Sequence, residues 1–364
     1  MNRRDLVAKL TAAASLPLAA ALAACTERPK EVRLLGWIGY DEEDLLRDFT
    51  AKTGIKVRVK TFIGGTEMLS ILSASPNEFD VVVLDPEFVR RAVSSNLLDE
   101  LNPADYDLSS YHPFFLAQDG AVQKTARIDG RLYAIPARYG LIGLMYNRDR
   151  VSEADMESFG ALWNPKYKGR IAAFAPLWQP LMGVVSLSLG NSGNPYDLTG
   201  QQLLAVEERL KSLRKEQQIA LHQSVPSLLD AFKSGTAWIM AAGADANAYS
   251  LRDNGSIAWS IPREGGIMWT ESLGLVKNSK NRDGAVKLIQ YLQSAEGQVR
   301  LARRSMYISS PPSLTALSML SEEERRLRKS ASRAELDQNL SRVVVRSLPS
   351  DEKAWKDAYE RFIR

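Results

Sequence analysis

The feature that most constrains the fold is a regular alternation of strand and helix patterns over residues 32–84. Three short apolar segments predict strands, and two amphipathic segments between them predict helices. In chain order the five segments are 32–35, 41–53, 55–59, 66–73 and 79–84. The last is apolar enough for a strand buried on both faces of a parallel sheet. This order predicts an α/β fold with a doubly wound sheet.

Three loops follow these strands, and all three should lie at one rim of the sheet. In open α/β sheets, ligands bind beyond the carboxyl ends of the strands. We therefore expect residues 37–40, 64–66 and 85–88 to face a common ligand crevice. Gly64 and Gly65 precede a helix, where their backbone amides could meet an anion, although a plain tight turn is the simpler interpretation.

The rest of the chain predicts a second α/β lobe and two passages between the lobes. Strand patterns at 132–136 and 141–146 flank the first passage, 137–140, and a second passage is expected at 263–269. The expected division is 32–137 plus 270–309 for lobe 1 and 141–265 plus 312–364 for lobe 2. Lobes joined by more than one strand can close on a ligand by hinge motion. A charge-laced segment, 321–338, predicts one helix with a solvated face.

The N-terminus has the pattern of an export signal. Arg3 and Arg4 precede a small apolar run that is too short to span a membrane as a helix. The pair fits a twin-arginine signal, and an ordinary secretory signal is the alternative. Leu22-Ala23-Ala24-Cys25 has the form of a bacterial lipobox, which predicts a signal peptide over 1–24, a lipidated linker over 25–31 and a lipid anchor on Cys25.

The composition argues against several classes of function. Cys25 is the only cysteine, so once acylated it leaves no thiol for a disulfide, a metal site or a nucleophile. His112 and His222 are isolated and lack metal-ligand spacing. The formal net charge of +4 comes from interspersed residues, which does not indicate a nucleic-acid partner. We expect a monomer without catalysis, cofactor or metal, although a paired-carboxylate hydrolase stays open.

Six segments together resemble the spermidine/putrescine-binding branch of the periplasmic binding proteins. They occur in that family's order and with its approximate spacing, over nearly the whole mature chain. The segments are LGWIGY at 35–40, FTAKTGIKV at 49–57, FDVVV at 79–83, LWNPKYKG at 162–169, EGGIMW at 264–269 and the helix pattern at 281–292. The resemblance implies a type II periplasmic binding protein fold with two lobes joined by a hinge.

The resemblance also implies a function. A protein of this kind captures a small polar solute outside the inner membrane and presents it to the permease subunits of an ABC importer. Acids and aromatics in the implied pocket favour a cationic, polyamine-like amine. The alternative is a sensor that presents an amino-acid-like or zwitterionic solute to a chemoreceptor or a histidine kinase.

Five residues match the family's pocket in type. Trp37 and Tyr40 stand where the family has aromatic walls, Trp269 and Glu271 where it has an aromatic and a carboxylate, and Tyr307 where another aromatic lines the cleft. Aromatic faces attract ammonium groups, and a carboxylate can pair with them. Trp269 and Glu271 are two positions apart, so on a strand both would face the ligand.

Other positions depart from the family's pattern. Asp85 and Glu87 stand where the family tends to carry a hydroxyl residue and a tyrosine, and we include both in the expected site. The family's second-lobe acids would fall near Pro176 and Gln179, which are uncharged. Because the acidic residues are distributed differently from those of the family, a zwitterionic ligand stays an alternative to a polyamine.

Several candidates have a structural alternative. Trp37 and Tyr40 could cap the core of lobe 1, and Asp85 could stabilise the following turn. Gln179 and Asp245 could lie in the cleft or on the surface.

Overall fold

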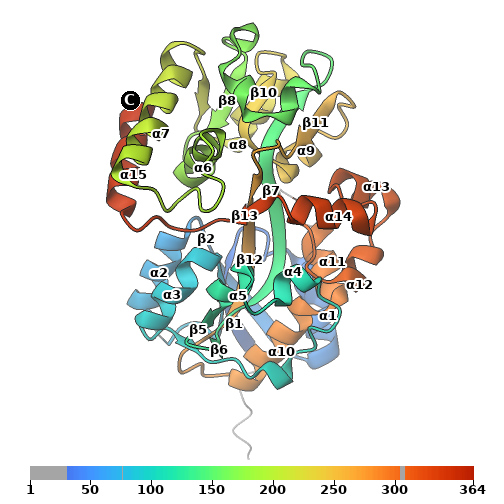
Figure 1. Ribbon diagram of the computed structural model, residues 1–364. Helices are drawn as coiled ribbons and strands as arrows, with labels where there is room; N and C mark the ends of the chain where they lie inside the picture. Colours follow the sequence, from blue (N-terminus) through green and yellow to red (C-terminus); the bar gives the residue numbers. More distant parts are fainter. Residues whose placement is uncertain (1–30, 76, 304–307) are drawn as a thin grey trace, which may run out of the picture.

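The computed structural model describes residues 31–75, 77–303 and 308–364. It has two α/β lobes, one above the other, joined by strands that run through both (Figure 1). The strands are β1 Glu31–Trp37, β2 Lys56–Phe62, β3 Val81–Leu84, β4 Leu98–Asp99, β5 Arg127–Ile128, β6 Arg131–Leu132, β7 Ile135–Asn147, β8 Ile171–Phe174, β9 Ala220–His222, β10 Ile239–Ala244, β11 Ile257–Ser260, β12 Gly266–Val276 and β13 Val343–Val345.

Helices cover the outer faces of both lobes. In the lower lobe of Figure 1 they are α1 Glu43–Thr53, α2 Gly65–Ala74, α3 Pro86–Ser94, α4 Pro113–Leu116, α5 Ala121–Ala126, α10 Arg282–Gln293 and α11 Ala295–Arg303. Beside the waist, next to α11, are α12 Leu314–Ser318, α13 Glu322–Leu327 and α14 Arg333–Leu340. In the upper lobe they are α6 Trp178–Ser188, α7 Gly200–Lys215, α8 Val225–Lys233, α9 Asp245–Ser250 and α15 Glu352–Ile363.

One sheet continues from lobe to lobe in the order β2-β1-β3-β12-β7-β10-β8-β9. β7 and β12 pair antiparallel at its centre, and Trp269 lies opposite Gly140 there. The second half of β12 pairs with β3, and the second half of β7 pairs with β10. Each lobe's sheet therefore extends from a different end of the same two strands, which places the waist of the molecule at the middle of this pair.

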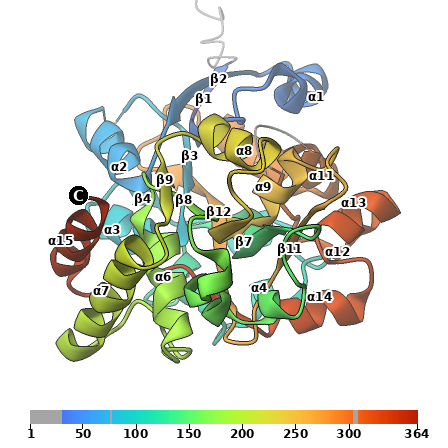
Figure 2. The same cartoon turned by 90° about the horizontal axis from the view of Figure 1, so that it is seen from above.

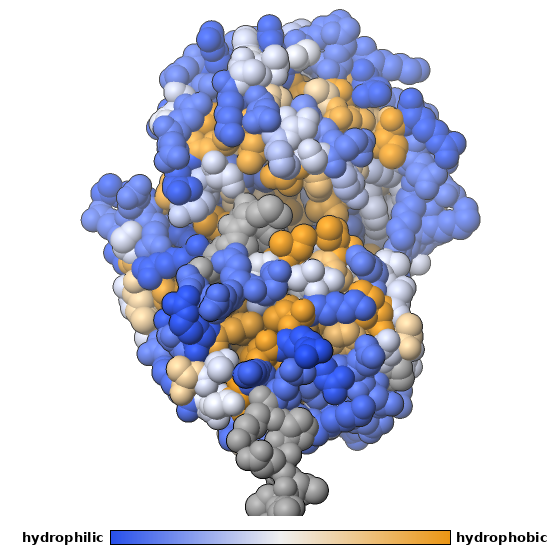
Figure 3. Space-filling model, turned by 180° about the vertical axis from the view of Figure 1, so that it is seen from behind, coloured by the Kyte–Doolittle hydropathy of each residue, from blue (hydrophilic) through white to orange (hydrophobic). Residues whose placement is uncertain are grey.

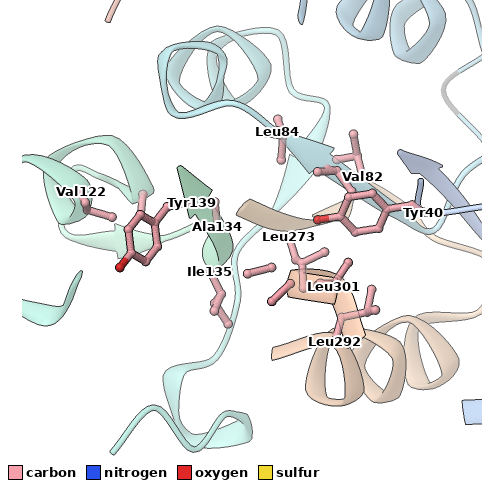
Figure 4. Packing of buried hydrophobic residues seen from close by; sticks show 14 of the residues in the cluster. Tyr40, Val82, Leu84, Val122, Ala134, Ile135, Tyr139, Leu273, Leu292 and Leu301 are labelled. Atoms are coloured by element: carbon pink, nitrogen blue, oxygen red, sulfur yellow. The ribbon is translucent and has the colours of Figure 1, made fainter. Parts of the chain in front are cut away.

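The doubly wound start of the chain is confirmed. β1 pairs in parallel with both β2 and β3, as the alternating pattern predicts. Gly54 ends α1 with φ of 71°, the left-handed conformation that glycine adopts without a steric cost. The core of this lobe is built around these strands, and Figure 4 shows Tyr40 among its packed side chains, next to Val82.

Two expectations about elements are wrong. The strand predicted at 132–136 is divided, since Leu132 belongs to β6 and β7 begins at Ile135. The strand predicted at 141–146 belongs to the same β7, because pairing with β12 continues across the expected passage with one irregularity beside Arg138. The helix predicted at 321–338 is two helices, α13 and α14. Between them Lys329 takes a φ of 49°, and the buried guanidinium of Arg328 donates to the carbonyl oxygens of Ser309, Glu324 and Ala302. This anchor interrupts the helix.

The C-terminal segment lies against both lobes. Seen from above, α12, α13 and α14 flank the central strands on one side and α15 on the opposite side (Figure 2). β13 joins them, pairing in parallel with the start of β12. Arg346 follows β13, and its backbone N–H donates to the carbonyl of Met268 at 2.8 Å, one residue before Trp269. The segment therefore carries Arg346 to the waist.

Candidate ligand-binding site

A cavity of about 510 Å³ lies between the two lobes. Its lobe 1 wall contains residues from all three loops expected at the rim, including Trp37, Gly64 and Asp85. Its lobe 2 wall includes the loop after β8, the start of α6, the end of β10 and residues of α9 and α15. The crossing strand β12 contributes Trp269 and Glu271. The prediction of a shared rim is therefore confirmed.

Aromatic rings form much of the cavity wall. Trp37 and Phe88 come from lobe 1, Trp178 from lobe 2, and Trp269 from the crossing strand. Two glycines allow two of these rings to approach the backbone. A Cβ on Gly140 would lie 2.4 Å from the indole of Trp269, and one on Gly65 would lie 2.2 Å from the ring of Phe88.

The two neighbouring glycines thus have separate structural tasks. Gly64 has a φ of 91°, which favours glycine, whereas Gly65 makes room for Phe88 at the first turn of α2. Both line the cavity. The tight-turn interpretation accounts for the pair without an anion.

The carboxylate of Glu271 is bound by an arginine of the same chain. Arg138 Nε and Nη2 donate to its two oxygens at 2.7 and 3.0 Å. The two residues lie directly opposite each other on β7 and β12, and both are almost completely buried. The guanidinium also packs over the ring of Tyr40, 4.9 Å from its centroid. Two parallel hydrogen bonds of this kind hold both partners in place.

A second arginine serves two carboxylates. Arg346 Nη2 lies 3.1 Å from Asp85 Oδ2, and Arg346 Nε donates to Glu87 Oε1 at 2.7 Å. All three side chains are buried. Burial raises the pKa of Asp85 to about 8; Arg346 opposes this rise, and the carboxylates of Glu87 and Glu271 add to it. The ionised form of Asp85 is therefore incompletely compensated by Arg346.

Charged residues at the rim connect the two lobes. Glu352 at the start of α15 pairs with Arg91 of α3 at 2.6 Å and with Lys356 of its own helix at 2.6 Å. Glu67 is an exposed rim residue whose carboxylate accepts a hydrogen bond from the backbone N–H of Ile63.

Ile63 and Leu177 expose apolar side chains on opposite lips of the cavity. From behind, apolar side chains gather at the waist and within each lobe, while the outer edges are hydrophilic (Figure 3).

The structure brings only part of the expected site to the cavity wall. Trp37, Asp85, Trp269, Glu271 and Gln179 line it. Of the other candidates, Tyr40 is fully buried in the lobe 1 core behind Arg138, and Glu87 is buried behind Arg346. Tyr307 and Cys25 lie outside the described residues.

Asp245 occupies a structural position at the start of α9. It is 1 % exposed, and its carboxylate accepts hydrogen bonds from the backbone N–H groups of Leu141 and Ala246. Burial raises the pKa of Asp245 to about 7, which these two hydrogen bonds oppose. Its contacts connect α9 to β7; its neighbours Ala246 and Asn247 line the cavity.

Sequence reasoning missed several residues of this site, including Arg138, Arg346, Trp178 and Lys356. Trp178 is the neighbour of Gln179, which was already a candidate, so it could have been included in the expected site. Arg138 falls in the stretch interpreted as a linker. Nothing in the local pattern around Arg346 or Lys356 marks them as cavity residues.

Within the described ranges, no helix is long and apolar enough to cross a membrane. The same part of the chain contains no cluster of three or more histidine, cysteine, aspartate or glutamate side chains suited to a metal ion.

Comparisons with known proteins agree on a family. The spermidine/putrescine-binding periplasmic protein of Escherichia coli is 27% identical over 296 residues, covering 79% of each chain. The putrescine/agmatine-binding protein of Pseudomonas aeruginosa is 26% identical over 299 residues, covering 77% of each chain. The spermidine/putrescine ABC transporter substrate-binding protein PotD from Streptococcus pneumoniae superimposes with a TM-score of 0.76 at 21% identity, over 92% of this chain and 98% of that one.

The family model for bacterial extracellular solute-binding proteins matches residues 44–324, most of the chain. The two-lobed arrangement is that of the periplasmic binding proteins, as the resemblance implied. Members of this family bind solutes for ABC transporters and are not enzymes, which confirms the expectation of a binding protein without catalysis. The chain belongs to the bacterial extracellular solute-binding protein family.

Proposed function

We propose that this protein captures a small amine outside the inner membrane and delivers it to the permease subunits of an ABC importer. The observation that carries the proposal is the position of Asp85, a buried carboxyl on the wall of a cavity framed by the indoles of Trp37, Trp178 and Trp269. The relatives named for spermidine, putrescine and agmatine binding support an amine as the solute.

The physical basis is the compensation of charge in a cavity of low polarity. Burial holds the pKa of Asp85 at about 8, so its ionised form lacks a full counter-charge. An ammonium group beside Asp85 would supply that charge. Indole faces attract the same group and exclude water from it, which strengthens the ion pair. Trp37, Asp85, Trp269 and Gln179 are thus proposed ligand contacts, and Arg138 and Arg346 orient the acids.

The proposal includes a lipid anchor, a monomer and motion between the lobes. We propose export followed by lipidation at Cys25 and cleavage before it, and lobes divided as the sequence predicts, closing about the middle of β7 and β12. Cys25→Ser should release the protein from the membrane fraction or stall its processing. Native protein that is soluble and cleaved elsewhere would refute the anchor without affecting the proposed ligand class.

Titration calorimetry with the purified mature chain tests the ligand class. At pH 8 we expect saturable binding of at least one of n-butylamine, putrescine and spermidine, and none of glucose or glutamate. Asp85→Asn should weaken amine binding by on the order of 2 kcal/mol or more, because the ammonium loses its desolvated partner. The matched control is Asp230→Asn, an exposed carboxylate of α8 outside the cavity. Equal affinity in wild type and Asp85→Asn would overturn the proposed contact, and binding of no amine would overturn the function.

A further inference from the structure

The charges inside the cavity are almost balanced by the protein itself. Arg138 donates from Nε and Nη2 to the two oxygens of Glu271, and Arg346 contacts both Asp85 and Glu87. Three buried carboxylates thus face two guanidiniums. Among the described residues, this cluster therefore has one negative charge without a full partner when all three acids are ionised.

In the part of the chain that the structure describes, the other carboxylates on the cavity wall, Glu67 and Glu352, do not provide a second buried anion. Glu352 already has two cationic partners, Arg91 and Lys356. Glu67 is exposed at the rim, where an ion pair contributes little because water screens it. Lys356 itself lines the cavity and would repel a second ammonium group.

From this arrangement we infer that the cavity selects amines with one ammonium group over diamines and polyamines, and that Arg138 is a residue that sets this selectivity. The inference rests on the proposed amine capture. Arg138 acts by pairing with Glu271, the second buried carboxylate on the wall, so that the described residues leave no desolvated anion for a second ammonium. The far end of the ligand must then be neutral or anionic, and Lys356 is a cation on the same wall that could pair with an anionic end.

Three probes with matched chains distinguish the possibilities. Putrescine, n-butylamine and 4-aminobutyrate share one ammonium on a four-carbon chain and end in an ammonium, a methyl and a carboxylate group. By calorimetry at pH 8 we expect putrescine to bind at least tenfold more weakly than the better of the other two. Tighter binding of 4-aminobutyrate, reduced in Lys356→Met, would assign a carboxylate to the far end, whereas tighter binding of n-butylamine would assign an apolar one.

Arg138→Gln tests the mechanism, with Arg138→Met as a second variant in case either folds poorly. Releasing Glu271 should shift the ratio of putrescine to n-butylamine affinity toward putrescine by at least tenfold. The control, Lys353→Met, removes the same charge from an exposed position of α15 and should leave the ratio unchanged. Putrescine that binds wild type within tenfold of n-butylamine, or more tightly, overturns the inference while the proposed function stands. An unchanged ratio in both folded Arg138 variants overturns the role of Arg138, and no binding of any amine overturns the function as well.

Discussion

Arg138 and Glu271 are cross-strand neighbours at the waist of the molecule, joined by two hydrogen bonds of 2.7 and 3.0 Å on the strands that run through both lobes. The side chain of Glu271 is 3% exposed and that of Arg138 1%. The pair therefore serves both the stability of the β7–β12 junction and the charge of the cavity. Without Arg138, the carboxylate of Glu271 could bind an amine. Paired with Arg138, it is a part of the cavity wall whose charge is neutralised.

A double-mutant cycle on this pair should show strong coupling. Removal of either partner leaves an uncompensated buried charge, so Arg138→Met and Glu271→Gln should each lower the free energy of unfolding by about 3 to 5 kcal/mol. The double variant should lose much less unfolding free energy than the sum of the two single losses, because it buries no unpaired charge. Urea denaturation of the four proteins measures this coupling. Additive losses would show that the two residues act independently.

The sequence predicts one half of the site better than the other. Trp37 and Asp85 directly follow apolar strands, and parallel pairing brings the ends of such strands to one edge, so their meeting could be predicted. Trp269 and Glu271 share a face through the two-residue period of a strand. These arguments need only local pattern and the direction of pairing.

The arginines could not be assigned in this way. Arg138 is 133 positions from Glu271, and Arg346 is 259 positions from Glu87. The chain contains 47 lysine and arginine residues, and no local pattern distinguishes these two from solvated charges. Their role depends on the register of β7 against β12 and on the path of β13. The expectation that Glu271 binds a ligand ammonium by charge did not take into account that Arg138 already pairs with its carboxylate.

Amine affinity should rise with pH up to about 8. The pKa of Asp85, raised to about 8 mainly by burial, means that Asp85 is protonated at lower pH and must lose its proton when an ammonium binds. Arg346, Glu87, Glu271 and Trp37 are the groups that act on it. An alkylammonium stays charged over this range, because its pKa is about 10.

Calorimetry with n-butylamine checks the profile. The association constant should increase about tenfold from pH 6 to 7 and about fivefold from pH 7 to 8, and then level off. In Asp85→Asn the profile should be flat. A wild-type association constant that does not change between pH 6 and 8 would show that Asp85 is already ionised without ligand.

Gly140→Ala should weaken amine binding through Trp269. The added Cβ would lie 2.4 Å from the indole, so the ring must move off the strand and out of its place in the cavity wall. Loss of the aromatic face should cost about 1 to 2 kcal/mol of binding, with about 1 to 3 kcal/mol of stability lost to overpacking. Gly193→Ala, where a Cβ meets open space, is the control. Wild-type affinity in a folded Gly140→Ala protein would argue that Trp269 does not contact the ligand.

The last prediction concerns the ion pair that spans the lips of the cavity. Arg91 of α3 and Glu352 of α15 meet at 2.6 Å from opposite lobes, with their side chains 46% and 18% exposed. A partly exposed pair contributes about 1 kcal/mol or less. The Arg91–Glu352 pair can form only while the lobes are close together, so it should stabilise the closed arrangement by about 1 kcal/mol or less.

Arg91→Met should therefore loosen the closed arrangement without unfolding the protein. We expect the amine dissociation constant to rise about two- to fivefold, and small-angle scattering should give a larger radius of gyration for the ligand-free variant than for wild type. At saturating n-butylamine both proteins should reach the same smaller radius. Arg90→Met, one position earlier on α3, removes the same charge from a side chain for which the described residues show no ion pair across the cavity. Equal radii for ligand-free Arg91→Met, Arg90→Met and wild type would mean that the pair does not hold the lobes together. A scattering profile that ligand leaves unchanged in all three proteins would mean that the two lobes form one rigid body around a preformed site.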